Sequence, residues 1–176
     1  ETGDNEENDV AFTIDYQVKD ADGDTADGDM VINVNDDTPD AETDIATNDD
    51  VQLDDDALTD GIVGGTGDVN PDTANLTGTL EHDYGADGEG TVLLLGTGAP
   101  TGFIYAVTDG GTVLTISQDG TDVVTVTLDD TTSGGYTVEH LAPIMHETLD
   151  GETGDNEEND VAFTIDYQVK DADGDT

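Results

Sequence analysis

Short segments of the chain alternate between apolar and polar residues, and turn-forming residues separate one segment from the next. The clearest is VAFTIDYQV at 10–18, where every second residue is apolar. This period of two predicts a half-buried β-strand. The segment MVINVN at 30–35 has the same period and can pair with it. The apolar side chains on the shared face would be Val10, Phe12, Ile14, Tyr16, Val18, Met30, Ile32 and Val34.

The same alternation continues through the second half of the chain. It predicts strands at 75–81, 91–95, 102–108, 112–117, 122–128, 135–142 and 161–169. Glycine-containing turns at 109–111, 118–120 and 133–135 connect several of them. The acidic stretch 36–75 predicts little regular structure beyond a short edge strand at 51–53. No segment shows a helical period, so we expect an all-β fold with essentially no helix, an antiparallel β-sandwich of Greek-key type.

Residues 1–25 recur without a change at 152–176, 151 positions later. Such identity indicates a tandem array, and because the chain begins at Glu1 we expect it to be an excerpt of a longer protein. We interpret 1–40 as the last strand pair of a preceding repeat, 41–74 as an acidic linker and 75–176 as a sandwich whose final strand is truncated. This predicts an exposed sheet edge, or an edge filled by residues 27–35 of this or a neighbouring chain.

Charge dominates the composition, with 45 acidic residues against two lysines and a formal net charge of −43. Nucleic acids and anionic membranes are therefore not expected partners. The absence of cysteine excludes disulfides and thiolate sites, and no apolar run reaches the roughly 20 residues that span a bilayer. Two explanations of the charge stay open: halophilic surface decoration, screened by salt, or local neutralisation by bound cations.

The loop DADGDT favours the second explanation. Asp20, Asp22 and Asp24 alternate along it, and Gly23 lets the chain curl around one point. Calcium takes six to eight oxygen ligands, which such a loop begins to supply. The alternative is a plain acidic turn, but three close carboxylates repel one another unless a cation lies among them. The second copy, Asp171, Asp173 and Asp175, has the same pattern at an end where it could be empty or disordered.

Other acidic segments are further metal candidates. In NVNDDTP, Asn35, Asp36 and Asp37 follow a strand that Pro39 ends; a solvated linker is the alternative. A third element could come from NEEND at 5–9, from its copy at 156–160 or from 48–50. The weaker candidates are Asp83, Asp87, Glu89, Glu157 and Asp160.

Catalysis is not expected, because the three histidines (His82, His140 and His146) are scattered and no nucleophile–base set is visible. The glycines of 91–102 are not followed by the helix that a dinucleotide site needs. A calcium-dependent carbohydrate-binding module is the alternative function, with Tyr84 and Tyr136 as its candidate aromatic residues.

Four phrases, which occur in the family's order, resemble the long tandem repeats of RTX adhesins, the giant type I-secreted adhesins of Gram-negative bacteria. They are NLTGTLEHDYGADGEGTVLLLGTGAPTGF, TVLTISQDG, NDVAFTIDYQVKDADGDTADG and VINVNDDTP. The resemblance implies immunoglobulin-like extender domains that project a distal ligand-binding domain for surface attachment and biofilm formation. It also implies an extracellular location on a marine or halotolerant bacterium, adjacent repeats as partners, and several Ca²⁺ ions that stiffen the junctions. We carry the calcium role to Asp20, Asp22, Asp24, Asn35, Asp36 and Asp37 only.

Overall fold

The computed structural model describes residues 10–41, 51–64, 75–146 and 161–176. All strand pairs in these residues are antiparallel. The predicted all-β antiparallel fold is confirmed, while its Greek-key and immunoglobulin-like topology stays a prediction. The described residues contain one helical element, the short 3₁₀ turn η1 (Asp55–Ala57). None of their helical structure is long and apolar enough to cross a membrane.

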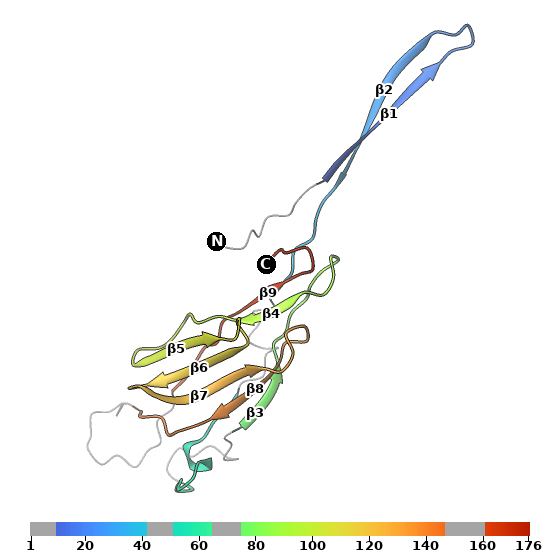
Figure 1. Ribbon diagram of the computed structural model, residues 1–176. Coiled ribbons are helices and arrows are strands. Elements are labelled where there is room, and N and C mark those ends of the chain that lie inside the picture. The colour runs from blue at the N-terminus through green and yellow to red at the C-terminus, as the bar shows by residue number, and fades with distance from the viewer. Residues whose placement is uncertain (1–9, 42–50, 65–74, 147–160) are drawn as a thin grey trace.

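A five-stranded sheet with the order β3-β8-β7-β6-β5 forms the main body (Figure 1). Its strands are β3 (Asn75–Thr79), β5 (Phe103–Thr108), β6 (Val113–Gln118), β7 (Thr121–Leu128) and β8 (Gly135–His140). A second sheet pairs β4 (Thr91–Leu94) with β9 (Tyr167–Lys170). The amides of Val92 and Leu94 donate to the carbonyls of Thr131 and Gly111, which fastens β4 to the turns of the larger sheet.

The hydrophobic core follows from the alternation seen in the sequence. Leu114 and Ile116 of β6 are buried while their neighbours are only partly so. In β7 the alternation breaks at two adjacent buried residues, Val123 and Val124. The register between β6 and β7 shifts at this point, between Ile116 and Ser117. A bulge places two consecutive side chains in the core, where a regular strand would turn one outward.

Glycine-containing turns connect the strands as the sequence predicts. Between β6 and β7, Asp119 and Gly120 both have positive φ, at 50° and 81°. Two such residues are what a two-residue hairpin turn matched to the strand twist requires. Gly110, Gly111 and Gly134 also adopt positive φ in the other two predicted turns.

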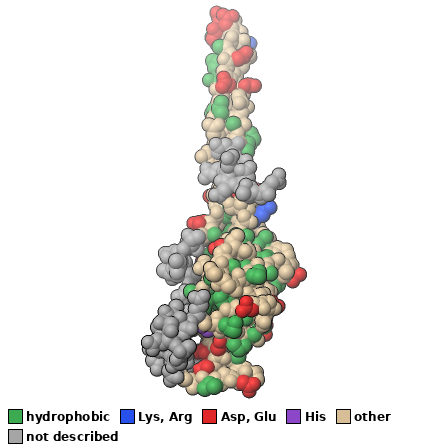
Figure 2. Space-filling view, turned by 90° about the vertical axis from the view of Figure 1, so that its left-hand side faces the viewer, with side chains coloured by type: hydrophobic (Ala, Val, Ile, Leu, Met, Phe, Trp, Pro, Cys, Tyr) green, Lys and Arg blue, Asp and Glu red, His purple; other side chains and the backbone are tan. Residues whose placement is uncertain are grey.

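The hairpin of β1 (Val10–Lys19) and β2 (Thr25–Val34) stands apart from the sandwich (Figure 1). Hydrophobic side chains lie along its length without cover in the space-filling view (Figure 2). The strand β2 begins at Thr25, earlier than the predicted 30–35. Ten residues of each strand are paired, from Val10 opposite Val34 to Lys19 opposite Thr25. Pairing begins at Lys19 and Thr25 because the tight 20–24 loop brings these two residues opposite each other.

Two predicted strands are wrong in part or in full. Residues 51–54 form no strand; Asp54 caps the 3₁₀ turn instead by accepting a hydrogen bond from the amide of Asp56. In the predicted strand at 161–169, residues 161–166 are not part of a strand, and β9 covers only the end. The physical reason is that β4 is four residues long, so the earlier part of the segment has no ladder to join.

Candidate metal centre

The second acidic loop, residues 171–175, is closed by its own backbone. Oδ1 of Asp171 accepts hydrogen bonds from the amides of Gly174 (2.9 Å) and Asp175 (2.8 Å). The amide of Asp171 also donates to the carbonyl of Asp175 at 3.1 Å. Gly174 has φ 117°, a conformation that favours glycine. Three hydrogen bonds within the loop therefore hold its backbone in one tight turn.

Three carboxylates of this loop converge. One oxygen from each of Asp171, Asp173 and Asp175 lies within 4.8 Å of the others. Asp171 and Asp175 are only 3% and 6% exposed, whereas Asp173 is exposed. Oδ2 of Asp171 is buried and has no hydrogen-bond partner in the described part of the chain. A buried carboxylate oxygen without a donor is unfavourable by itself, so this atom is open to a further ligand, either a water or a cation.

The first copy of the loop has the same backbone conformation in different surroundings. Oδ1 of Asp20 accepts from the amides of Gly23 (3.0 Å) and Asp24 (2.9 Å), and Gly23 has φ 109°. Asp20, Asp22 and Asp24 again offer oxygens within 4.8 Å, but all three residues are exposed. The local sequence thus determines the loop, and packing against the sandwich determines whether it is buried.

A second cluster joins three segments that are far apart in the sequence. Asp36 follows β2, Asp87 lies in the 81–90 loop, and Asp173 belongs to the second acidic loop; one oxygen from each lies within 4.8 Å of the others. Since Asp173 belongs to both clusters, they form one acidic centre. We call Asp36, Asp87, Asp171, Asp173 and Asp175 the junction centre, because it lies where the hairpin joins the sandwich (Figure 1).

Backbone contacts hold the linker after β2 against the 81–90 loop. Asp40 and Asp83 exchange two backbone hydrogen bonds, of 2.8 and 2.9 Å. Oδ2 of Asp37 accepts from the amide of Ala86 at 2.8 Å. Gly85, with φ 72°, lies against Asp37, and a Cβ there would come within 2.6 Å of Oδ2. These contacts bring Asp36 beside Asp87.

Glycine at position 90 lets the 81–90 loop reach the second acidic loop. A Cβ at Gly90 would collide with the carbonyl oxygen of Lys170 and the backbone of Asp171.

Gly90→Ala is therefore expected to lower the free energy of unfolding by about 1–3 kcal/mol, because one of the two loops must move. Chemical denaturation measures this. Gly96→Ala is the matched control, since its Cβ would meet Val107 at an ordinary 3.4 Å; equal losses in the two variants would contradict the argument.

Crowding of like charges shifts the ionisation of these carboxyls. A hydrogen bond with Asp171, then burial and the charges of Asp171, Asp36 and Asp175, raise the pKa of Asp173 to about 6. Burial raises the pKa of Asp171, but hydrogen bonds from the loop amides and from Asp173 outweigh it and hold the pKa below its ordinary value. In the first copy, a hydrogen bond with Asp22 and the loop amides lower the pKa of Asp20. The carboxylates around Asp173 therefore oppose its ionisation.

The remaining candidates have other roles or lie elsewhere. The side chains of Asp37 and Asp83 accept hydrogen bonds from backbone amides where the linker meets the 81–90 loop. Asp37 accepts from Ala86, and Asp83 accepts from Gly85 at 2.9 Å. Burial of Tyr84 raises the pKa of its phenol, and the nearby charge of Glu89 raises that pKa further. Glu89 is in none of the acidic groups found among the described residues. Asn35 lies directly after β2. Glu157 and Asp160 lie outside the described residues.

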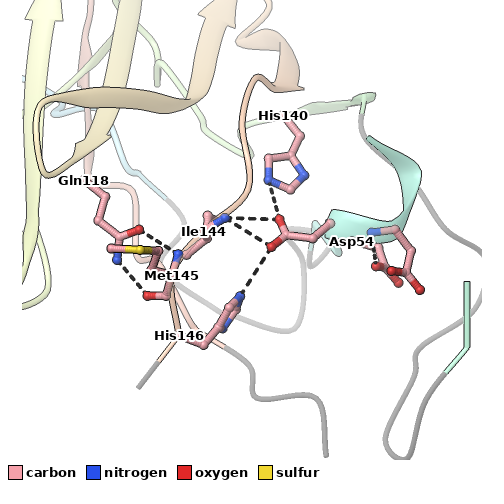
Figure 3. Close-up of polar contacts among 8 residues, drawn as sticks. Asp54, Gln118, His140, Ile144, Met145 and His146 are labelled. Carbon is pink, nitrogen blue, oxygen red and sulfur yellow. Dashed lines mark hydrogen bonds and ion pairs between the residues drawn. The ribbon is translucent and has the colours of Figure 1, made fainter. Parts of the chain in front are cut away.

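Two of the three histidines that are scattered in the sequence, His140 and His146, lie close together at the other end of the sandwich. Figure 3 shows His140, His146 and the amide of Ile144 directed at one carboxylate, that of Asp55. Nε2 of His140 is 3.0 Å from Oδ1, and Nε2 of His146 is 3.9 Å from Oδ2. These contacts fasten the 51–64 segment to the end of β8. No sequence signal links Asp55 to residues so far along the chain.

The aromatic residues named for carbohydrate binding are engaged in the fold. Tyr136 is 7% exposed, in the core, and covers the cross-strand Gly78. Tyr84 is partly buried and donates a hydrogen bond to the carbonyl of Thr132 at 2.9 Å. The ring of Tyr136 is therefore buried, and the ring of Tyr84 makes an edge contact with His82, with 4.7 Å between the ring centroids.

The junction centre fits a hard divalent cation. Its side chains offer carboxylate oxygens only, which are ligands that Ca²⁺ prefers, and one of them, Oδ2 of Asp171, is buried without a donor. Comparison of the chain with protein families, with curated proteins and with solved structures finds no significant match.

Proposed function

We propose that this chain is a structural spacer, an extender module of a long bacterial surface adhesin, and that Ca²⁺ at the junction centre stiffens it. The observation that carries the proposal is the convergence of Asp36, Asp87 and Asp173. These residues come from the linker after the hairpin, from a loop of the sandwich and from the second acidic loop. A cation held among them connects the hairpin to the sandwich.

The chain's own residues prepare this connection. The paired backbone of Asp40 and Asp83 and the contact of Asp37 with Ala86 hold the linker in place. The loop amides fix Oδ1 of Asp171 and leave Oδ2 for another ligand. Bound Ca²⁺ supplies positive charge that offsets the repulsion among the carboxylates. A junction with both backbone contacts and a bound cation resists bending better than a solvated linker.

The repeat supports the spacer role and the extracellular setting. A perfect copy of 25 residues, 1–25 at 152–176, is typical of arrays in which length and stiffness matter more than a particular site. Calcium sites of extracellular modules have dissociation constants of roughly 10⁻⁴–10⁻³ M. Such sites fill outside the cell and stay empty in a cytosol that is poor in calcium. Adjacent repeats of the same polypeptide are then the natural partners, and type I secretion fits export of the loose calcium-free chain.

Asp36→Asn tests the junction centre directly. We expect its calcium affinity, measured by isothermal titration calorimetry, to fall on the order of tenfold, because one ligand charge is lost. Asp29→Asn is the matched control: it removes the same charge from the exposed strand β2, outside the acidic groups. Equal weakening by the two substitutions would mean that calcium is held only by the diffuse negative field, and the proposal would then be wrong.

A further inference from the structure

The end of β8 carries a buried imidazole beside a carboxylate. The side chain of His140 is 1% exposed, and its Nε2 lies 3.0 Å from Oδ1 of Asp55. Neither ring nitrogen of His140 makes a hydrogen bond within the described part of the chain, so the contact with Asp55 lacks the alignment that a hydrogen bond needs. A buried polar atom without a partner is unfavourable, so Nε2 of His140 is open to a further ligand.

A second imidazole faces the other oxygen of the same carboxylate (Figure 3). Nε2 of His146 is 3.9 Å from Oδ2 of Asp55, and the His146 side chain is 30% exposed. The amide of Ile144 donates to Oδ1 and Oδ2 of Asp55, at 3.3 and 3.1 Å, and so orients the carboxylate. Gln118 exchanges two hydrogen bonds of 2.7 Å with the backbone of Met145. The carboxylate and the backbone before His146 are therefore held in place, while the partly exposed His146 ring can turn toward them.

We propose that Asp55, His140 and His146 bind a divalent metal ion of the Zn²⁺ type. Two imidazole nitrogens and one carboxylate oxygen are a ligand set that such ions take, with water in a fourth position. Two ligands of a tetrahedral ion with bonds of about 2.0–2.1 Å lie about 3.3 Å apart, close to the 3.0 Å between His140 and Asp55. These three residues are not among the groups whose donor atoms already lie within 4.8 Å of one another, so binding requires the His146 ring to swing toward His140.

A metal accounts for the buried imidazole better than an ion pair with Asp55 alone. In an ion pair the N–H of His140 would point at Oδ1, but Nε2 is close to this oxygen without that alignment. Two ligands of one metal have this arrangement, because each directs its lone pair at the ion. The site also differs in chemistry from the junction centre, since Ca²⁺ prefers oxygen ligands to imidazole. The inference therefore does not depend on the proposed calcium function.

The imidazole ¹⁵N NMR signals of the unsubstituted chain test the site, because the chain has three histidines. One equivalent of Zn²⁺ is added in excess Ca²⁺, which masks the carboxylate clusters. The Nε2 signals of His140 and His146 should move together, and both rings should then carry their proton on Nδ1. His82 is the internal control, because its ring nitrogens already face the carbonyls of Leu80 and Thr132 at 2.7 and 3.1 Å. An unchanged His140 signal, or an equal change in all three rings, would overturn the inference.

Isothermal titration calorimetry with Zn²⁺, again in excess Ca²⁺, measures the contribution of the carboxylate. Asp55→Asn should weaken Zn²⁺ binding at least about tenfold, because a charged ligand is lost while the amide oxygen can still accept from Ile144. Asp60→Asn is the matched control, since it removes the same charge from an exposed residue of the same segment and Asn tolerates its φ of 72°. The same loss of affinity in both variants would contradict the site. If zinc binds as expected but Asp36→Asn leaves calcium affinity unchanged, only the proposed calcium function fails.

Discussion

Calcium at millimolar concentration is expected to raise the melting temperature of this chain, and EGTA should reverse the rise. At a concentration tenfold above the dissociation constant, a site that exists only in the folded state adds about 1.4 kcal/mol. For a domain of 60–100 residues this corresponds to a shift of roughly 6–11 °C per site. The junction centre is the site most closely coupled to the fold, because Asp171 and Asp175 are buried against the sandwich.

Sodium chloride at the same ionic strength is the control that separates coordination from screening. With a net charge of −43, any salt stabilises the folded chain to some extent. Coordination predicts a rise with calcium that matched sodium chloride does not reproduce and that is smaller in Asp36→Asn. An equal rise with the two salts, or an undiminished rise in that variant, would favour halophilic screening. Differential scanning calorimetry measures the melting temperatures of the unsubstituted chain and of Asp36→Asn, each with calcium and with sodium chloride.

Phe163→Ala and Phe12→Ala are expected to differ by several kcal/mol, although the two residues have the same neighbours in sequence. Phe163 packs against the core and against Phe103, so its truncation should lower the free energy of unfolding of the sandwich by about 2–4 kcal/mol. Phe12 is 54% exposed on the free hairpin, and its truncation should change this value by less than about 0.5 kcal/mol.

Urea denaturation at low protein concentration measures the pair, since dilution keeps the chains monomeric. Tyrosine fluorescence can follow the unfolding of the sandwich, because Tyr105 and Tyr136 lie in the core. Equal destabilisation by the two substitutions would mean that the hairpin packs on the sandwich in solution, against the arrangement in Figure 1. Unchanged stability in both would mean that the 161–166 segment leaves the core.

Much of the candidate centre was predictable from sequence because its loops are local structures. In DADGDT the aspartate side chain bonds to amides three and four residues later, and both copies do this in the same way. Such contacts need only the residues of the loop itself. Asp36 and Asp87 were each predicted as candidates, but their meeting with Asp173 was not. That meeting depends on the pairing of Asp40 with Asp83 and on the space that Gly90 leaves for Lys170.

The sequence by itself determined the antiparallel strands, the glycine turns and the acidic loops of this protein. Each of these depends on the alternation of side chains or on contacts a few residues apart, and these act wherever the segment lies. Only the tertiary structure decided which copy of VAFTIDYQVK is buried, which aspartates share one centre and where Asp55 meets His140. Identical residues had different outcomes because burial depends on what surrounds a strand, and one copy lies against the sandwich while the other projects into solvent.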